Sequence, residues 1–208
     1  ETFSIGGQAI LRRRRHRQAM TAVQRDGMNL VNVRPELQAD RDIVLAAVRQ
    51  DGRALQFADP VLREDSEIVM EAVQKNGNAL EFASLNLQAD REIVMAAVQK
   101  NGIALQFANP NMPQYREIVM AAVQENGSVL FIVSQEYRMD REIIMAAVSQ
   151  NGNAIQYASE ELRGDREIVL AAVRENGRAL RIDGPDKFQT DREIVMAAWQ
   201  ALFRHGNR

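Results

Sequence analysis

Apolar side chains recur along this chain in a pattern that repeats every 25 residues. Each period holds a stretch whose apolar positions follow helical spacing, as at Ile93, Val94, Ala97 and Val98. An acid precedes the stretch, and an Asn-Gly or Asp-Gly pair follows it. This order predicts an N-cap, a helix of about three turns, and a left-handed glycine that ends the helix. The glycines that mark the period are Gly27, Gly52, Gly77, Gly102, Gly127, Gly152 and Gly177.

A second, shorter apolar segment follows each of these glycines. Residues 78–84 predict a helix of about two turns with Leu80, Phe82 and Ala83 facing inward. The first helix of each repeat is apolar on nearly all sides, so neighbouring repeats have to cover it. One repeat buries too little apolar area to offset the entropy of ordering its own backbone. The predicted fold class is therefore all-α, an α-solenoid of about seven two-helix repeats of 25 residues.

Three apolar columns run through the repeats. Two are predicted to be buried core, and their members are Ile43, Ile68, Ile93, Ile118, Ile143, Ile168 and Ile194, and Leu55, Leu80, Leu105, Leu130, Ile155 and Leu180. The third alternates methionine with leucine, at Leu45, Met70, Met95, Met120, Met145, Leu170 and Met196. We interpret the third column as core packing as well, since leucine conserves methionine's volume but cannot bind a soft metal.

An acid stands at the start of most of the first helices, where its side chain can accept hydrogen bonds from unpaired amides. These acids are Asp40, Asp65, Asp90, Asp140, Asp165 and Asp191, and Tyr115 takes their place once. An arginine comes next in the sequence at Arg41, Arg91, Arg116, Arg141, Arg166 and Arg192, where a positive charge opposes the helix dipole. We therefore predict a ladder in which each arginine bridges to an acid of the adjacent repeat. The alternative is a solvated edge.

The two ends of the chain differ from the repeats. Residues 1–17 contain Arg12, Arg13, Arg14, Arg15 and Arg17 with Glu1 as their one acid, whereas residues 18–208 hold 27 acids against 21 Lys and Arg. We predict a basic and flexible N-terminal arm over residues 1–17. The helical array over residues 18–208 is expected to finish in a capping helix that starts at Arg192 and runs toward Gly206.

The five arginines are candidate anion-binding residues, for nucleic acid, an anionic membrane surface or an acidic protein. The alternative is a flexible processing remnant. Nucleic-acid binding by the repeats themselves is not expected, because the array is acidic and lacks a basic stripe with stacking aromatic side chains.

Residues suited to catalysis are scarce. The chain has no cysteine, its two histidines, His16 and His205, lie in the terminal segments, and nearly every repeat acid has a capping role. We therefore predict that the protein is not an enzyme and holds no cofactor and no metal. Apolar runs such as residues 93–98 are far shorter than the ~20 residues of a membrane-spanning helix.

The start of the chain bears on where the protein works. It begins at Glu1 and is Arg-rich over its first 25 residues, which favours an intracellular protein, in the cytoplasm or in an organelle reached by a cleaved N-terminal segment. An expression fragment explains the missing methionine equally well. We expect a soluble protein.

Variation between repeats indicates where a partner would bind, because packing holds inward columns constant and leaves outward columns free. The residue after each repeat glycine is predicted to be exposed. Three apolar residues stand out among polar columns around the fourth and fifth repeats: Ile103, Phe131 and Met139. We predict a protein-binding patch there; the alternative is local repacking that buries Phe131.

A second candidate patch lies on the terminal helix, at Trp199, Leu202 and Phe203. Either a partner covers these residues, or they fold back to seal the last core. Together the patches favour a non-catalytic protein-binding scaffold or an accessory structural subunit of a larger assembly, with proteins as partners. The alternative function is a nucleic-acid or anionic-surface binder that works through the Arg-rich arm.

The sequence motif of the repeat resembles that of a known family. The sequence DREIVMAAVQ, followed by Asn-Gly and then by Ala-Leu-Gln-Phe-Ala, is nearly intact at residues 90–108 and 140–159. It closely resembles the repeat of the uncharacterised family called domain of unknown function 4116, over residues 18 to about 200. The resemblance implies a multi-copy intracellular helical repeat, and it carries no catalytic residue to transfer.

Overall fold

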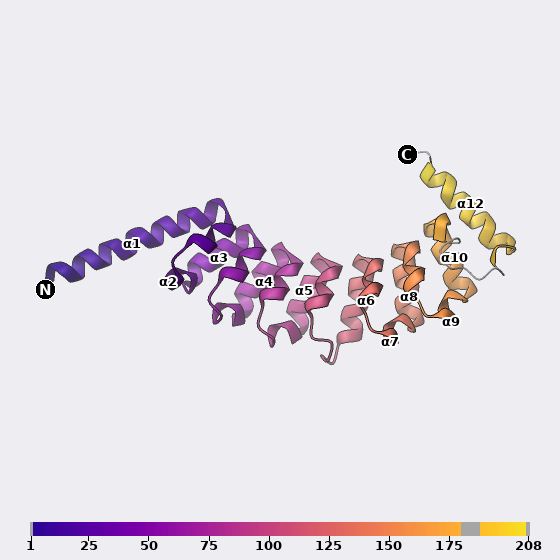
Figure 1. Cartoon of the computed structure of the whole chain (residues 1–208), viewed down its shortest axis with the longest axis horizontal. Helices are drawn as coiled ribbons and strands as arrows, with labels where there is room; N and C mark the ends of the chain where they lie inside the picture. Colours follow the sequence, from indigo (N-terminus) through magenta and orange to yellow (C-terminus); the bar gives the residue numbers. More distant parts are fainter. Residues whose placement is uncertain (1, 180–187, 207–208) are drawn as a thin grey trace. The chain divides into compact units, whose positions relative to one another are not determined.

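A computed structural model describes residues 2–179 and 188–206 of the chain. The chain divides into two compact units, Glu1–Pro113 and Gln114–Arg208, here called unit 1 and unit 2. Over the described residues every element is an α-helix or a 3₁₀-helix, and within each unit consecutive repeats pack side by side (Figure 1). The predicted all-α repeat solenoid is confirmed.

Each repeat pairs one α-helix with one 3₁₀-helix, and a short linking turn follows. In unit 1 the elements are α1 (Thr2–Arg25), η1 (Gly27–Asn32), α2 (Pro35–Gln38), α3 (Arg41–Gln50), η2 (Gly52–Phe57), η3 (Leu62–Glu64), α4 (Ser66–Lys75), η4 (Gly77–Phe82), η5 (Leu87–Ala89), α5 (Arg91–Lys100) and η6 (Gly102–Phe107). In unit 2 they are α6 (Tyr115–Glu125), η7 (Gly127–Phe131), α7 (Gln135–Arg138), α8 (Arg141–Gln150), η8 (Gly152–Tyr157), α9 (Glu160–Arg163), α10 (Arg166–Glu175), η9 (Gly177–Ala179) and α12 (Arg192–Gly206).

The capping acids begin the long helices as predicted. The Asp90 carboxylate accepts hydrogen bonds from the backbone N–H groups of Glu92 and Ile93, both at 3.0 Å. Asp40, Asp65, Asp140, Asp165 and Asp191 make the same pair of bonds. Helix α6 lacks this cap, because Tyr115 replaces the acid and the side chain of the N-cap residue, Gln114, makes no capping hydrogen bond.

The long helices end through an aspartate or asparagine in extended conformation. At the end of α3, Asp51 has φ −141° and ψ 112°, and its backbone N–H donates to the carbonyl oxygen of Ala47. The Asp51 carboxylate then accepts from the backbone N–H of Arg53 at 2.9 Å. One residue thus ends an α-helix with its backbone and caps the following 3₁₀-helix with its side chain. Asn76, Asn101, Asn126 and Asn151 repeat this geometry.

The second segment of each repeat is a 3₁₀-helix rather than the predicted α-helix of two turns. In η4, Leu80 and Ala83 are buried as expected, whereas Phe82 is only half-buried. A 3₁₀-helix has about three residues per turn, so six residues complete two turns and bring residues 80 and 83 to one face.

The repeat glycines do not adopt the predicted left-handed conformation. Among the glycines that the structure describes, none has a positive φ. Crowding requires them instead: a Cβ on Gly152 would collide with the carbonyl oxygen of Ala172 in the next repeat and lie 3.0 Å from the backbone nitrogen of Asn176. Gly27, Gly52, Gly77, Gly127 and Gly177 meet the next repeat in the same way.

The two predicted core columns are buried. In the first column the fully buried members are Ile43, Ile68, Ile118, Ile143, Ile168 and Ile194, and Ile93 is nearly so. In the second column the buried members are Leu55, Leu80, Leu105, Leu130 and Ile155, and Leu180 lies outside the described residues. The prediction of core packing for the methionine column holds for Leu170, which is buried, but not for the rest of the column. Leu45, Met70, Met95, Met120 and Met145 are half-buried, and Met196 is 53 % exposed.

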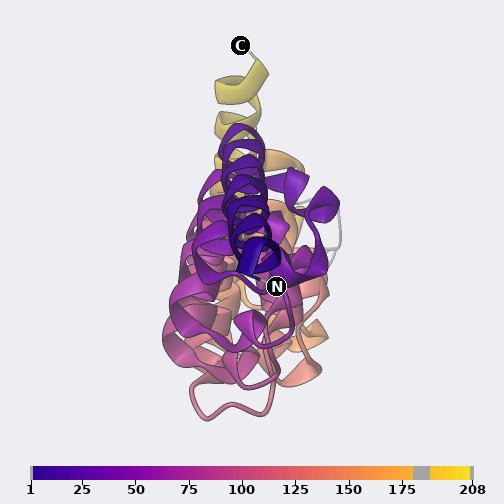
Figure 2. The same cartoon turned by 90° about the vertical axis from the view of Figure 1, so that its left-hand side faces the viewer.

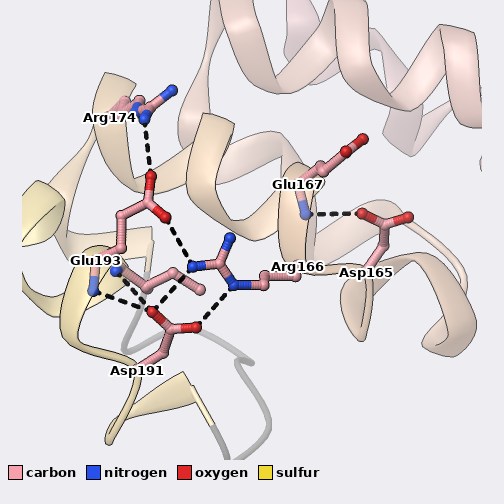
Figure 3. A network of polar contacts seen from close by, with 7 residues as sticks. Asp165, Arg166, Glu167, Arg174, Asp191 and Glu193 are labelled. Atoms are coloured by element: carbon pink, nitrogen blue, oxygen red, sulfur yellow. Dashed lines mark hydrogen bonds and ion pairs between the residues drawn. The ribbon is translucent and has the colours of Figure 1, made fainter.

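The predicted arginine ladder is confirmed for Arg41, Arg116, Arg141 and Arg166, whereas Arg192 pairs with no described residue. Arg116 donates from Nε to Asp140 at 2.8 Å and from Nη2 to Glu142 at 2.7 Å. Arg166 reaches Asp191 and Glu193 in the next repeat, both at 2.8 Å, and Arg174 adds a contact to Glu193 (Figure 3). Arg41 and Arg141 make equivalent pairs, with Asp65 and Glu67 and with Asp165 and Glu167.

The ladder lowers the pKa of its aspartates. Burial alone would raise the pKa of Asp140, but the hydrogen bond from Arg116, the backbone N–H of Ile143 and the arginine's charge outweigh it. The net pKa of Asp140 therefore lies below its ordinary value, and the same holds for Asp65 and Asp165. Each such aspartate stabilises the fold more when ionised than when protonated.

Two further sets of hydrogen bonds join neighbouring repeats. The side-chain amides of Asn101, Asn151 and Asn176 each donate to the side chain that follows the previous repeat's glycine: Asn78, Ser128 and Asn153, at 2.9 Å. The backbone carbonyls of Gln38, Arg63, Gln88 and Arg138 accept from backbone N–H groups of the following repeat. These bonds involve no charge, so salt screens them far less than it screens the ladder.

Helix α1 carries the predicted arm and the first repeat as one continuous helix. It runs without a break across the expected boundary after residue 17. Its C-terminal half packs on α3 and η1, with Ala19 and Val23 buried, while residues 8–15 are exposed. Figure 2 views unit 1 from the N-terminal side, with α1 nearest the viewer.

The glycine contact predicts that Gly152→Ala is destabilising. The added methyl group forces η8 away from α10, and overpacking of this kind costs about 1–3 kcal/mol. Urea unfolding followed by circular dichroism measures the loss. Gly164→Ala is the control, because its φ of −88° suits alanine, and it should change stability little. Equal stability of both variants would contradict the contact.

The ladder predicts a pH-dependent effect of Asp140→Asn. Asparagine caps a helix about as well as aspartate does, so the substitution removes the charge and leaves the cap. Because the folded-state pKa of Asp140 is lowered, its contribution is fully present above the unfolded value of about 3.9 and is lost as the pH falls through the folded value. Asp140→Asn should therefore lower the thermal midpoint at pH 7 and match the native chain in strong acid.

Salt provides the control for this prediction. Arg116 is half exposed, so 1 M NaCl should shrink the difference between Asp140→Asn and the native chain. A difference that persists unchanged in acid and in salt would mean that the carboxylate acts by packing, not by charge.

Candidate interaction surfaces

Helix α12 buries one side and exposes the other. Ile194, Ala198 and Ala201 are buried, and the helix packs against α10 and η9. On the opposite side Trp199 is 57 % and Phe203 66 % exposed. The two rings stack on each other, with centroids 5.7 Å apart and planes 30° from parallel. The spacing of four residues places both rings on one stripe of the helix.

The exposed stripe corresponds to a face that is covered in the preceding repeat. Aligned by the repeat, Trp199 stands where α10 has Val173, and Val173 is fully buried. Helix α12 itself packs against α10. The stripe of α12 is thus the kind of surface on which this fold places another helix.

Leu202 and Met196 border this stripe. Leu202 is 43 % exposed, and its Cγ would lie 2.8 Å from a Cβ added at Gly177, so it belongs partly to the contact with η9. Met196 joins the exposed face although the sequence pattern placed it in the core. The three predicted residues therefore lie together, and Trp199 and Phe203 do not fold back to seal the last core.

A second apolar surface lies within unit 2. Phe131 is 50 % and Met139 56 % exposed, so the alternative in which repacking buries Phe131 is wrong. The Phe131 ring lies 6.4 Å from the ring of Tyr157, centroid to centroid. Arg138 holds the backbone here, since its Nη2 donates to the Phe131 carbonyl oxygen at 2.9 Å.

Ile103 is not exposed as predicted. It lies in η6 of unit 1 and is half-buried. Its column is not uniformly outward: Asn78 accepts a hydrogen bond from Asn101 of the following repeat, whereas Arg53 and Arg178 are exposed. Variation between repeats therefore did not by itself indicate exposure.

The predicted anion-binding arginines form an uncompensated basic surface on α1. Arg12, Arg13, Arg14, Arg15 and Arg17 are exposed, and none makes an ion pair with any residue that the structure describes. Residues 2–25 contain no acid. Between them, His16 lies 3.3 Å from Asp40 and takes the place of the ladder arginine in the first repeat.

Arg15 also lines a cavity of about 380 Å³ between α1, η1 and α2. Arg25 and Arg34 line the same cavity, and the sequence reasoning missed both. Comparison of the first repeat with the others could have found it, because Gln18 and Asn32 replace the apolar residues Ile43 and Phe57. We call this cavity the N-terminal groove.

The repeat acids cap helices and form ion pairs with the ladder arginines. Within residues 2–179 and 188–206, no three histidines, cysteines or carboxylates come together as a metal site would need, and no polar side chain is fully buried. No helix in the described ranges is both long enough and apolar enough to span a membrane.

Comparison with known proteins identifies the repeat. A family model described as domain of unknown function (DUF4116) matches residues 18–63, 65–113, 115–163, 140–182 and 165–198. No curated protein and no solved structure matches the chain. The matches cover most of the sequence and start anew at successive repeats, as the resemblance in the repeat wording predicted. The chain therefore belongs to the family described as domain of unknown function (DUF4116).

Proposed function

We propose that this protein is a non-catalytic scaffold, or an accessory structural subunit of a larger assembly, that binds a protein partner through the exposed stripe of α12. The observation that carries the proposal is the stacked pair Trp199 and Phe203, exposed on a face whose counterpart in α10 is buried. Tryptophan and other large aromatic side chains supply much of the binding energy in protein interfaces. The repeat acids serve as helix caps and as ladder partners, and these are structural roles.

The expected occupant of the stripe is a helix with an apolar face. Every long helix inside unit 2 is covered by the next long helix, as α8 is by α10 and α10 by α12. Met196 at the edge of the stripe adds an adaptable side chain, which can fit a partner of a different shape. Phe131 and Met139 form a second contact surface of the same scaffold.

The array needs no oxidising compartment to fold. It contains no cysteine, and its buried columns hold the repeats together without disulfides. We accordingly place its binding partners inside the cell, in the cytoplasm or in an organelle.

Affinity capture with variant chains tests the docking surfaces. Trp199→Asp with Phe203→Asp should abolish retention of the main partner, because two charges replace the aromatic pair at the centre of the stripe. Phe131→Asp tests the second surface in the same way. Quantitative mass spectrometry of the captured proteins is the measurement.

The matched control for these captures is Leu85→Asp. Leu85 is 80 % exposed and stands outside both surfaces, so its variant introduces the same charge without touching either. Thermal melts should show that all the variants remain folded. Retention of every partner by the α12 and Phe131 variants would remove both surfaces from consideration.

The unpaired arginines of α1 support a second candidate function, binding of nucleic acid or another anionic surface. Affinity for duplex DNA should then fall with salt, with a slope of roughly −0.9 in log K against log salt for each phosphate neutralised. Changing Arg12, Arg13, Arg14, Arg15 and Arg17 to Gln should flatten this slope. Fluorescence anisotropy across 50–300 mM salt, on the order of the physiological range, measures it. A slope that the changes leave intact would argue for docking through apolar surface instead.

A further inference from the structure

We propose that the N-terminal groove is a binding site for an acidic polypeptide segment that carries an apolar side chain beside its carboxylates. The groove is a cavity of about 380 Å³ between α1, η1 and α2, within the size range of ligand pockets in proteins. It lies in unit 1 and is separate from the stripe of α12, so the inference goes beyond the docking function proposed above.

The walls of the groove carry positive charge without compensation. Arg15, Arg25 and Arg34 line it, and no carboxylate does. None of the three arginines forms an ion pair with another described residue. A guanidinium group donates two parallel hydrogen bonds to a carboxylate, so three free groups around one cavity suit an acidic ligand.

The floor of the groove is apolar. Ala19 is buried, and Ala22, Val33 and Leu37 are half-buried along the same cavity. An aliphatic side chain placed there would lose its contact with water while the carboxylates beside it reach the arginines. A ligand with charge alone would leave this floor uncovered.

The first repeat departs from the others at positions that line the groove, and several of these departures add a hydrogen-bond donor, although Ala19 for Val44 and Val33 for Ala58 do not. Aligned by the repeat, Arg15 replaces the capping acid found at Asp40, and Gln18 replaces the buried Ile43. Asn32 likewise replaces the aromatic Phe57. If this face only had to be solvated, carboxylates would suit it as well as hydrogen-bond donors do. The preference for donors at these positions therefore points to an anionic ligand.

A second copy of the chain does not fit this site. In the ladder, the arginine of one repeat meets the acid of the next, as Arg41 meets Asp65. In the first repeat Arg15 holds the acid's place, so the terminal ladder arginine of another copy, Arg192, would meet a like charge. Single-stranded nucleic acid fits poorly as well, because the groove has no aromatic side chain on which a base could stack.

Fluorescence anisotropy with the full chain tests the proposal. The probe is a labelled peptide that alternates glutamate with leucine, compared with one in which glutamine replaces glutamate, one in which glycine replaces leucine, and a labelled oligothymidine. Only the first peptide should bind well. Arg25→Gln with Arg34→Gln should weaken that binding about tenfold or more, as expected for the loss of charge-assisted hydrogen bonds.

Two further variants keep the test specific. Lys75→Gln with Lys100→Gln removes the same charge from another part of unit 1 and should leave the affinity within about twofold, since those exposed side chains lie outside the groove. Asn32→Phe restores the aromatic residue of the other repeats and should fill the groove, which abolishes peptide binding without lowering the thermal midpoint. Trp199→Asp should leave peptide affinity unchanged, so loss of α12 docking and loss of this site are separable.

The following results would overturn the proposal. Tighter binding of oligothymidine than of the acidic peptide would replace the proposal with a nucleic-acid site. Equal weakening by the Lys75 and Lys100 changes would reduce it to non-specific attraction by charge. Failure of the acidic peptide to bind, or full binding by a folded Asn32→Phe chain, would remove the groove as its site.

Discussion

Within each unit, the close approach of a repeat glycine to a carbonyl oxygen of the next repeat is the constraint on which the rest of the structure depends. With no side chain between them, the start of one 3₁₀-helix lies directly against the end of the following long helix. That contact fixes the distance between successive repeats. The isoleucine and leucine columns can then interdigitate, and the arginine of one helix can reach the acids that begin the next.

The same contact explains what sequence reasoning could and could not predict. The capping acids, the isoleucine column and the arginine ladder follow from properties of a single helix and from the repetition of its charges, so the pattern revealed them. The role of the glycine depends on a backbone atom of the following repeat, Ala172 in the case of Gly152, which no local pattern reports. A helix end in left-handed conformation requires glycine, and so does a helix end with no room for a Cβ atom. The sequence alone could not distinguish these two reasons.

Two other differences have similar causes. Over six residues, α-helical and 3₁₀-helical geometry bury nearly the same apolar positions, so the pattern could not distinguish them at Gly77–Phe82. The methionine column and Ile103 were misplaced because hydrophobicity and variability were taken as measures of burial and exposure. Met120 is apolar yet only partly covered, and Ile103 occupies a variable column yet is half-buried. On the surfaces, Phe131, Trp199 and Phe203 were predictable as apolar exceptions, whereas Arg25 and Arg34 look ordinary until their cavity is seen.

The ladder also gives the array a direction, and its two ends carry the same sign of charge. At every junction where the ladder is seen, an arginine of one repeat forms an ion pair with acids of the next repeat. At one end Arg192 is a donor that pairs with no described residue, and at the other Arg15 and Arg17 occupy the acceptor positions. Helix α1 thus interrupts the charge order of the ladder, because it presents guanidinium groups where the following repeats present carboxylates.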